Sequence, residues 1–511
     1  MKKIIYLIIL LFITSHSFAN NLVMGTPVYN GTTNTLTFTI KWDNSWRVNG
    51  NQGPNNYDAV CVFVKRQPCA ANGIWSHAIL SSTAADHSVT GAYSLVADPV
   101  TDGMGVFIHR DANANNQIGN LTTTSSVVIK LSGTYSPALI GSSSSSDNFK
   151  VIGIEMVYVP TASFYIGDGR STNTSNFSPG NTIGAIQITS TTQSNGIGAY
   201  SNYVSNPTYG CVIPLPSTYP LGYNGFYCMK YEINQQQIID YLNTLTYDQQ
   251  AGRLAVWGAR VPSAVNTYWN NNGYRQNIRV GTAGTNNTIP AVFVIDNVWN
   301  AYLPAGYMNW QDLTSYLDWS GLRPMTEFEY EKACRGTLNP VAYEYPWGTT
   351  AISMVDGRNT NTNTATEGNN TVADGLVHAN WDGGSARSGF AATSNSNRVQ
   401  AAATFYGIMD MAGNVMEQCV GGGTGYNYAT FTNANGDGVL TKTGLANTTG
   451  WPTDGGLQSG TILKGGGYYT NSGQATQMQV SDRQFYGGTT LNQTINSTKD
   501  RSYGGRGVRN Y

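Results

Sequence analysis

The sequence has little charge. Only 11% of its 511 residues are Asp, Glu, Lys or Arg, and the formal net charge is −1. Phosphate binding needs clustered lysine and arginine, and no basic stripe is present, so no nucleic-acid partner is expected. Asn, Thr, Ser and 32 Tyr residues take the place of the missing charges. This composition is typical of extracellular, loop-rich β proteins and of adaptable polar recognition surfaces.

Cysteine and histidine are also scarce. Six cysteines in a chain of this length do not form a disulfide scaffold. Cys61 and Cys69 are close enough in sequence to close a hairpin-sized loop, and the pairing of the others is left open: Cys211, Cys228, Cys334 and Cys419. Zinc or non-haem iron held by histidine is not expected, because no two of the four histidines after residue 20 have metal-ligand spacing: His77, His87, His109 and His378.

The sequence has no hydrophobic run of the roughly 18 residues that a membrane-spanning helix needs. The run Ile4–Ile13 is shorter, follows Lys2 and Lys3, and precedes the small residues of Ser17–Ala19. This is the pattern of a secretory signal peptide. We predict a signal peptide over residues 1–19, no membrane span, and a mature protein that is secreted, periplasmic or at the cell surface.

Residues 20–148 read as an all-β domain. Short runs of alternating or β-branched residues are bounded by Asn- and Gly-rich turns: Thr35–Ile40, Val60–Val64 and Ser126–Leu131. A β-sandwich is the expected packing of such strands. The serine run 142–146 is the expected linker to the next domain.

Residues 149–511 have a mixed α+β pattern. Two strands are expected at Glu155–Pro160 and Phe164–Gly167. Helical periodicity predicts helices over Gln235–Leu245 and Trp310–Trp319. A third helix begins at Thr326, where Thr326 and Glu329 form a capping box, and stops at Gly336. The long Asn-, Gly- and Thr-rich region that follows indicates loops that hold ions or carry function.

Several motifs in this half occur in a fixed order. They are Glu155–Pro160, Gly225–Ile233, Trp319–Gly336, Tyr345–Gly348, Tyr406–Glu417, Leu463–Tyr468 and Gly507–Arg509. In order and content this series resembles the formylglycine-generating enzyme (sulfatase-modifying factor) domain family. The resemblance implies an irregular, C-type-lectin-like α+β domain with much loop over residues 149–511, preceded by the all-β sandwich.

The resemblance also implies where the family's oxidases carry their two copper-binding cysteines. At the ungapped positions this chain has Thr470 and Ala475, and no cysteine follows Cys419. Without thiolates there is neither a soft ligand for Cu(I) nor a sulfur nucleophile. We therefore expect no copper cofactor, no catalytic residue and no formylglycine-generating activity, as in a pseudoenzyme.

Calcium is the cofactor that the resemblance favours. The family's calcium loop corresponds to Asp410, Gly413, Val415 and Glu417, which together offer carboxylate and carbonyl oxygens. The alternative is that Asp410 and Glu417 are ordinary acids. A second, weaker site begins at Asn380 and Trp381.

Two other segments open like calcium loops. They are Asp111–Asn115 and Asn433–Gly438, but neither has a glutamate at the twelfth position. A simple turn is the favoured reading of both.

Candidate ligand-binding residues surround the vacated catalytic strand. They are Tyr468, Tyr469, Gln474, Gln477, Asp482, Arg483 and Arg509. The arginines suit a carboxylate or sulfate and the tyrosines a sugar ring. Alternatively, Arg509 and the glycines 465–467 hold the final hairpin.

The favoured function is calcium-stabilised recognition of a glycan or extracellular protein by a secreted or cell-envelope protein. The alternatives are a copper-independent oxidase of the same family, working through acidic residues, and a structural envelope component. A deep pocket holding acids near Tyr468–Arg483 would favour the enzyme, and a shallow aromatic surface would favour the binder.

Overall fold

The computed structural model describes the following residues: 21–49, 54–68, 74–114, 117–133, 135, 147–170, 176–179, 184–192, 197–200, 218–254, 260–269, 273–421, 431–453, 460–483 and 499–510. The predicted signal peptide, the serine linker, Cys69, Cys211 and Asn115 lie outside these ranges. Within them, no helix is long and apolar enough to cross a membrane.

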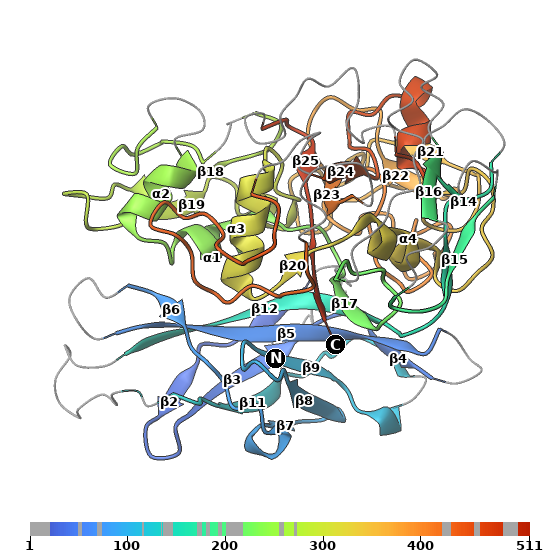
Figure 1. Cartoon of the computed structure of the whole chain (residues 1–511). Coiled ribbons are helices and arrows are strands. Elements are labelled where there is room, and N and C mark those ends of the chain that lie inside the picture. Colours follow the sequence, from blue (N-terminus) through green and yellow to red (C-terminus); the bar gives the residue numbers. More distant parts are fainter. Residues whose placement is uncertain are drawn as a thin grey trace, which may run out of the picture.

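A five-stranded antiparallel sheet forms the lower layer of the molecule (Figure 1). Leu36, Phe38 and Ile40 alternate along one face of its central strand and pack against valines of the layer above. The predicted strands Thr35–Ile40 and Ser126–Leu131 are present to within one residue. The members are β1 (Val23–Met24), β2 (Val28–Asn30), β3 (Thr35–Lys41), β7 (Ser88–Thr90) and β11 (Ser125–Lys130).

A larger sheet forms the middle layer. Among the described residues it has ten strands, in the order β10-β4-β5-β12-β17-β26-β20, with β6 and β9 also pairing with β5 and β8 with β9. They are β4 (Ser45–Val48), β5 (Asn56–Gln67), β6 (Ser76–His77), β8 (Leu95–Pro99), β9 (Val106–Arg110), β10 (Gln117–Gly119), β12 (Asn148–Val159), β17 (Phe226–Met229), β20 (Arg323–Pro324) and β26 (Gly507–Asn510).

Strand β12 joins the two halves of the chain. It pairs with β5 from Asn148 to Val157 and with β17 from Met156 to Val159. The boundary expected between residues 148 and 149 therefore falls at the start of β12, and the sheet continues across it. Strand β5 is buried on both faces, which explains its nearly continuous apolar run.

Four α-helices are described, and they lie above the large sheet (Figure 1): α1 (Gln235–Leu242), α2 (Tyr247–Leu254), α3 (Trp310–Ser320) and α4 (Glu327–Arg335). The predicted capping box at Thr326 is present. The Glu329 amide donates to the Thr326 hydroxyl at 3.1 Å, and the Thr326 amide donates to Glu329 Oε2 at 3.0 Å. The first predicted helix ends three residues earlier than expected, at Leu242.

The rest of the described chain consists of short pairs, 3-10 turns and long loops, so that the fold is mixed and strand-rich. The pairs are β13 (Phe164–Ile166) with β15 (Ile186–Ile188), β14 (Asn176–Pro179) with β16 (Ile197–Tyr200), β18 (Ile278–Thr282) with β19 (Val292–Ile295), and β21 (Ser353–Val355) with β22 (Leu376–His378). Strand β23 (Met416–Val420) lies between β24 (Thr461–Lys464) and β25 (Tyr503–Gly504). The 3-10 turns are η2 (Ala84–Asp86), η3 (Ala112–Ala114), η6 (Val298–Tyr302) and η8 (Ser472–Met478).

Candidate functional site

The positions that correspond to the family's cysteines lie just after β24. Thr470 is buried, and its hydroxyl oxygen accepts a hydrogen bond from the Gly467 amide at 2.9 Å. Ala475 lies in η8. The four cysteines in the described part of the chain are buried free thiols: Cys61, Cys228, Cys334 and Cys419. Burial raises the pKa of Cys61 to about 11 and of Cys228 to about 12, which disfavours the thiolate form that binds metal.

Two exposed aromatic side chains lie beside this strand. The Trp381 amide donates to the carbonyl of Tyr468, and the Asn380 amide donates to that of Thr470, both at 2.9 Å. The fold thereby brings the weak second calcium candidate next to the ligand-binding candidates. Trp381 is 43% exposed and Tyr469 is 41% exposed, whereas Tyr468 is fully buried.

Two arginines pack against these aromatic rings. The Arg358 guanidinium lies 4.9 Å from the centre of the Trp381 ring. The Arg501 guanidinium lies between the rings of Tyr274 and Tyr469, at 4.6 and 4.5 Å. Each arginine also pairs with an aspartate, Asp356 and Asp382 respectively, so that the charge is locally balanced. We call Trp381, Tyr469, Arg358, Arg501 and Asp382 the aromatic face.

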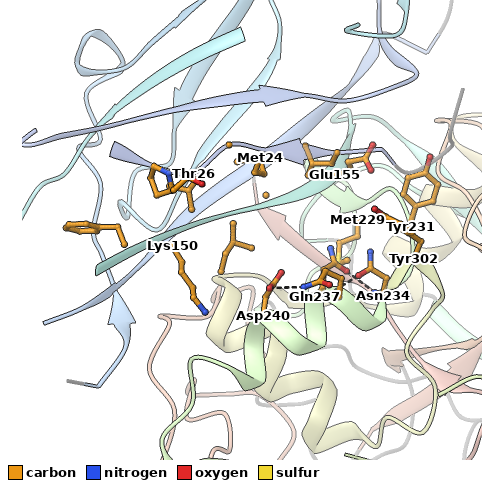
Figure 2. A pocket seen from close by; sticks show the side chains of 18 of the residues that line it. Met24, Thr26, Lys150, Glu155, Met229, Tyr231, Asn234, Gln237, Asp240 and Tyr302 are labelled. Atoms are coloured by element: carbon orange, nitrogen blue, oxygen red, sulfur yellow. Dashed lines mark hydrogen bonds between the residues drawn. The ribbon is translucent and has the colours of Figure 1, made fainter. Parts of the chain in front are cut away.

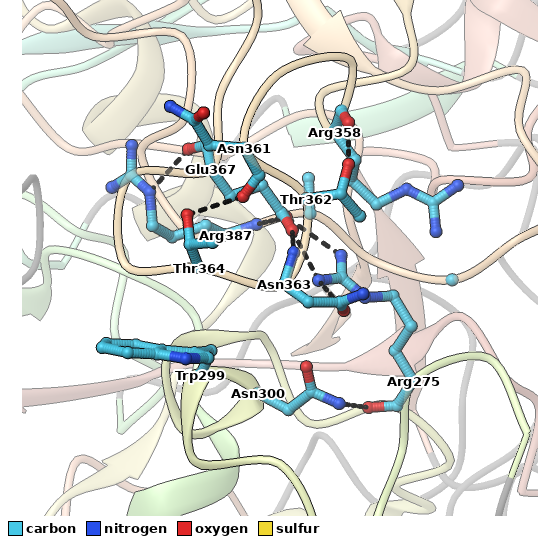
Figure 3. A network of polar contacts seen from close by, with 12 residues as sticks. Arg275, Trp299, Asn300, Arg358, Asn361, Thr362, Asn363, Thr364, Glu367 and Arg387 are labelled. Carbon is cyan, nitrogen blue, oxygen red and sulfur yellow. Dashed lines mark hydrogen bonds and ion pairs between the residues drawn. The ribbon is translucent and has the colours of Figure 1, made fainter.

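A buried carboxylate, that of Glu367, holds the polar network around the loop that follows Arg358 (Figure 3). The two oxygens of Glu367 accept from the Arg275 guanidinium at 2.5 and 2.9 Å and from the backbone amides of Asn363 and Arg387. The Arg387 guanidinium donates to the Glu367 carbonyl at 2.8 Å. Glu367 therefore anchors the loop that carries Arg358. Its partner Arg275 directly follows Tyr274, whose ring packs against Arg501.

The other predicted ligand residues lie elsewhere or are buried. Arg483 donates two hydrogen bonds of 2.7 Å to the carboxylate of Glu327, and Arg509 donates two of 2.6 Å to that of Asp102. Both guanidinium groups thus hold chain segments together. For Arg509, this is a structural role like the alternative that the sequence left open. Gln477 and Asp482 are also buried, and Gln474 is exposed on η8.

The predicted calcium loop brings its two acids close to a third, Glu232. Oε1 of Glu417 pairs with Arg506 at 2.6 Å, while its Oε2 is buried without a hydrogen-bond partner in the described structure. Asp410 is in the left-handed region, with φ of 55°, and its Oδ2 accepts from the Gly389 amide at 2.6 Å. Burial, then the charges of Asp410 and Glu417, raise the pKa of Glu232 well above its usual value.

Arg506 was not anticipated from the sequence. Its guanidinium is fully buried and donates to the carboxylate of Glu417 and to the carbonyls of Met229, Lys230, Met409 and Asp410. No local signal predicts this, because the partners come from two segments that are far from Arg506 in sequence.

In the two calcium-like openings outside the family motifs, the aspartates accept hydrogen bonds from backbone amides. Asp318 Oδ1 accepts the Asp437 amide at 3.0 Å, and Asp437 Oδ1 accepts the Val439 amide at 2.9 Å. In the first opening, the carboxylate of Asp111 accepts the Asn113 amide. Within the described ranges, no three His, Cys, Asp or Glu side chains are grouped as metal ligands.

A family model described as a sulfatase-modifying factor enzyme 1-like domain matches residues 154–511, more than half of the chain. The chain belongs to this sulfatase-modifying factor family. A search of curated proteins finds no match. Among solved structures, this family member is similar to the Major Tropism Determinant U1 Variant, with 12% identity, a TM-score of 0.24, and 84% of this chain and 85% of that chain covered.

Proposed function

We propose that this family member is a recognition protein that binds a glycan through its aromatic face. A second, extracellular protein is the other ligand that such a face would accept. The proposal rests on one observation: beside the strand where the family's oxidases carry their thiolates, this chain exposes Trp381 and Tyr469 over paired arginines.

An aromatic ring that is held flat by an arginine behind it offers a rigid, largely neutral platform. Tyrosine and tryptophan supply large contact area at low cost in side-chain entropy. Arg501 and Asp382 stand at the edge of the platform as donors and acceptors for hydroxyl groups. Ligand binding should cost little further conformational entropy, because Glu367 already fixes the supporting loop.

A glycan array with the purified mature protein tests this function. The wild-type chain should bind a restricted set of glycans, and Trp381→Ala and Tyr469→Ala should each lower affinity for the hit at least tenfold in titration calorimetry. Tyr93→Ala is the matched control, because Tyr93 lies in the N-terminal part of the chain, where its hydroxyl pairs with that of Thr122, and the variant should leave affinity unchanged. Binding that survives both face variants would place the ligand elsewhere and refute the proposal.

The proposal includes a stabilising calcium ion at Asp410, Gly413, Val415 and Glu417. The unpartnered Oε2 of Glu417 and the electrostatic repulsion among Glu232, Asp410 and Glu417 support it, because a divalent cation would coordinate the free oxygen and offset the repulsion. When bound, the ion would hold the loop between β22 and β23 through carboxylate and carbonyl oxygens. A location outside the cytoplasm, from the signal peptide over residues 1–19, is likewise part of the proposal.

A further inference from the structure

A lysine and two carboxylates are buried together on the large sheet. Lys230 Nζ lies 3.8 Å from Asp58 Oδ2 and 3.6 Å from Glu155 Oε1, and all three side chains are at most 5% exposed. The rings of Trp46 and Tyr231 lie 4.9 and 5.5 Å from the same nitrogen. The three groups therefore share an enclosed environment with little access to bulk water.

Three neighbouring strands place these groups on one face. Asp58 of β5 is opposite Val157 of β12, two residues from Glu155, so both carboxylates project from the same side of the sheet. Lys230 directly follows β17, on the other side of β12, and its amide donates to the Glu155 carbonyl at 2.9 Å. Lys230 belongs to the family motif, whereas Asp58 comes from the N-terminal all-β part.

Three hydrogen-bond donors hold the Asp58 carboxyl group in one orientation next to Lys230. Its Oδ2 accepts from the Trp42 indole at 2.8 Å, and its Oδ1 accepts from the Ser45 hydroxyl and the Trp46 amide at 2.9 Å. Fixed donors of this kind stabilise negative charge that develops on a carbonyl oxygen during addition of a nucleophile. They also restrict the carbon atom to one position relative to Lys230.

The low-polarity surroundings favour the neutral form of the two carboxyl groups. Burial raises the pKa of Asp58 and raises that of Glu155 to about 7. A neutral carboxylic acid beside an amine can pass protons in both directions at neutral pH. Amide formation is helped by a protonated acceptor carboxyl and by a nearby acid that protonates the departing oxygen.

We propose that Lys230 and Asp58 form an intramolecular isopeptide bond, with Glu155 transferring the protons. The Lys230 nitrogen attacks the Asp58 Cγ and a C–N bond forms. Glu155 accepts a proton from the nitrogen and returns one to a carboxyl oxygen, the C–O bond breaks, and one water molecule leaves. No oxidant, cofactor or second substrate is consumed.

A cavity provides an exit for that water. Glu155 lines a pocket of about 470 Å³ between the N-terminal strands and α1, and Figure 2 shows it next to Met229 and Tyr231. The resulting bond would covalently join β5 to the end of β17, across β12. It would thus fasten the N-terminal part to the family domain in a chain whose described cysteines are all unpaired.

Two other lysine–aspartate pairs serve as internal controls. Lys130 and Asp86 are closer, at 3.0 Å, but their side chains are 42% and 28% exposed. Lys499 and Asp312 are buried and 2.6 Å apart, but Arg253 also pairs with Asp312, so that this carboxyl group is shared between two cations. Neither pair should become linked.

Mass spectrometry of the purified full chain tests the proposal. The intact mass should be lower than that of the mature sequence by one water molecule. A digest should contain one branched peptide that joins the segments around residues 58 and 230, and fragment ions should place the bond between these two side chains. Linear peptides covering both residues without a branched product would overturn the proposal.

Two variants separate the chemistry from the ion pairs. Lys230→Arg keeps a cation beside both carboxylates but should show the mass calculated from its own sequence, with no loss of water. Glu155→Gln keeps the size of the side chain and should leave most of the protein unlinked. A branched peptide of wild-type yield in Glu155→Gln would refute the role of Glu155, and water loss that persists in Lys230→Arg would refute the bond itself.

Discussion

Substitution of Lys65 by methionine should change how the stability of the protein depends on pH. Lys65 lies on β5 and is 1% exposed. Its ammonium group donates to the Trp319 carbonyl at 2.5 Å, lies 4.8 Å from the Trp319 ring, and is 3.3 Å from His77 Nδ1. Burial is the main cause that lowers its pKa from 10.5 to about 7.

The sign of the effect follows from proton binding. Between the folded pKa of about 7 and the unfolded pKa of 10.5, the unfolded chain holds a proton on Lys65 that the folded chain has released. The free energy of unfolding therefore rises with pH across this window and falls as pH returns to 7. At about 1.4 kcal/mol per pH unit, and with partial titration near pH 7, Lys65 should add about 2 kcal/mol between pH 7 and pH 9.

Urea unfolding of wild type and Lys65→Met at pH 7 and pH 9 measures this contribution. From pH 7 to pH 9, the free energy of unfolding of wild type should rise by about 2 kcal/mol relative to that of Lys65→Met. Titrations that both proteins share cancel in this difference. His77 does not interfere, because burial holds its pKa well below 6.5. Lys130→Met, at an exposed lysine, is the control and should show no shift. A Lys65→Met difference that is equal at both pH values would refute the reasoning.

Three further outcomes are expected. Removal of calcium with a chelator should lower the melting temperature at neutral pH, and calcium at about 100 times its Kd should restore about 2.7 kcal/mol by mass action; an identical chelator response in Glu417→Gln would exclude the proposed loop. A chain starting at residue 149 should fail to fold, because β12 would lose its pairing with β5 and the core would lose Cys61, Phe63 and Phe107; a soluble fragment with a cooperative melting transition would contradict this. Supplied with copper and oxygen, the protein should convert no cysteine of a sulfatase-type peptide to an aldehyde, and a mass change above a no-protein control would return it to the oxidase class.

Local patterns in the sequence were sufficient for several of the elements and for the family. Alternation predicts β3 and β11, and the run of β-branched residues predicts β5. Each pattern follows from the number of neighbouring layers against which the side chains of the strand pack. The capping box at Thr326 fixes the start of α4 within four residues of chain. The ordered motifs, read in the same way, identify the sulfatase-modifying factor domain over residues 154–511.

Tertiary structure alone decided which of the candidate residues are exposed on the aromatic face and which hold the fold. Arg483 follows one family motif and Arg509 belongs to another, yet their partners, Glu327 and Asp102 respectively, lie far away in sequence. Trp381 reaches the aromatic face because its amide pairs with the carbonyl of Tyr468 in the turn after β24. Contacts of this kind, like the shared strand β12 and the meeting of Lys230 with Asp58, depend on register and packing between distant segments. Such pairings have no period along the chain, so no sequence pattern predicts them.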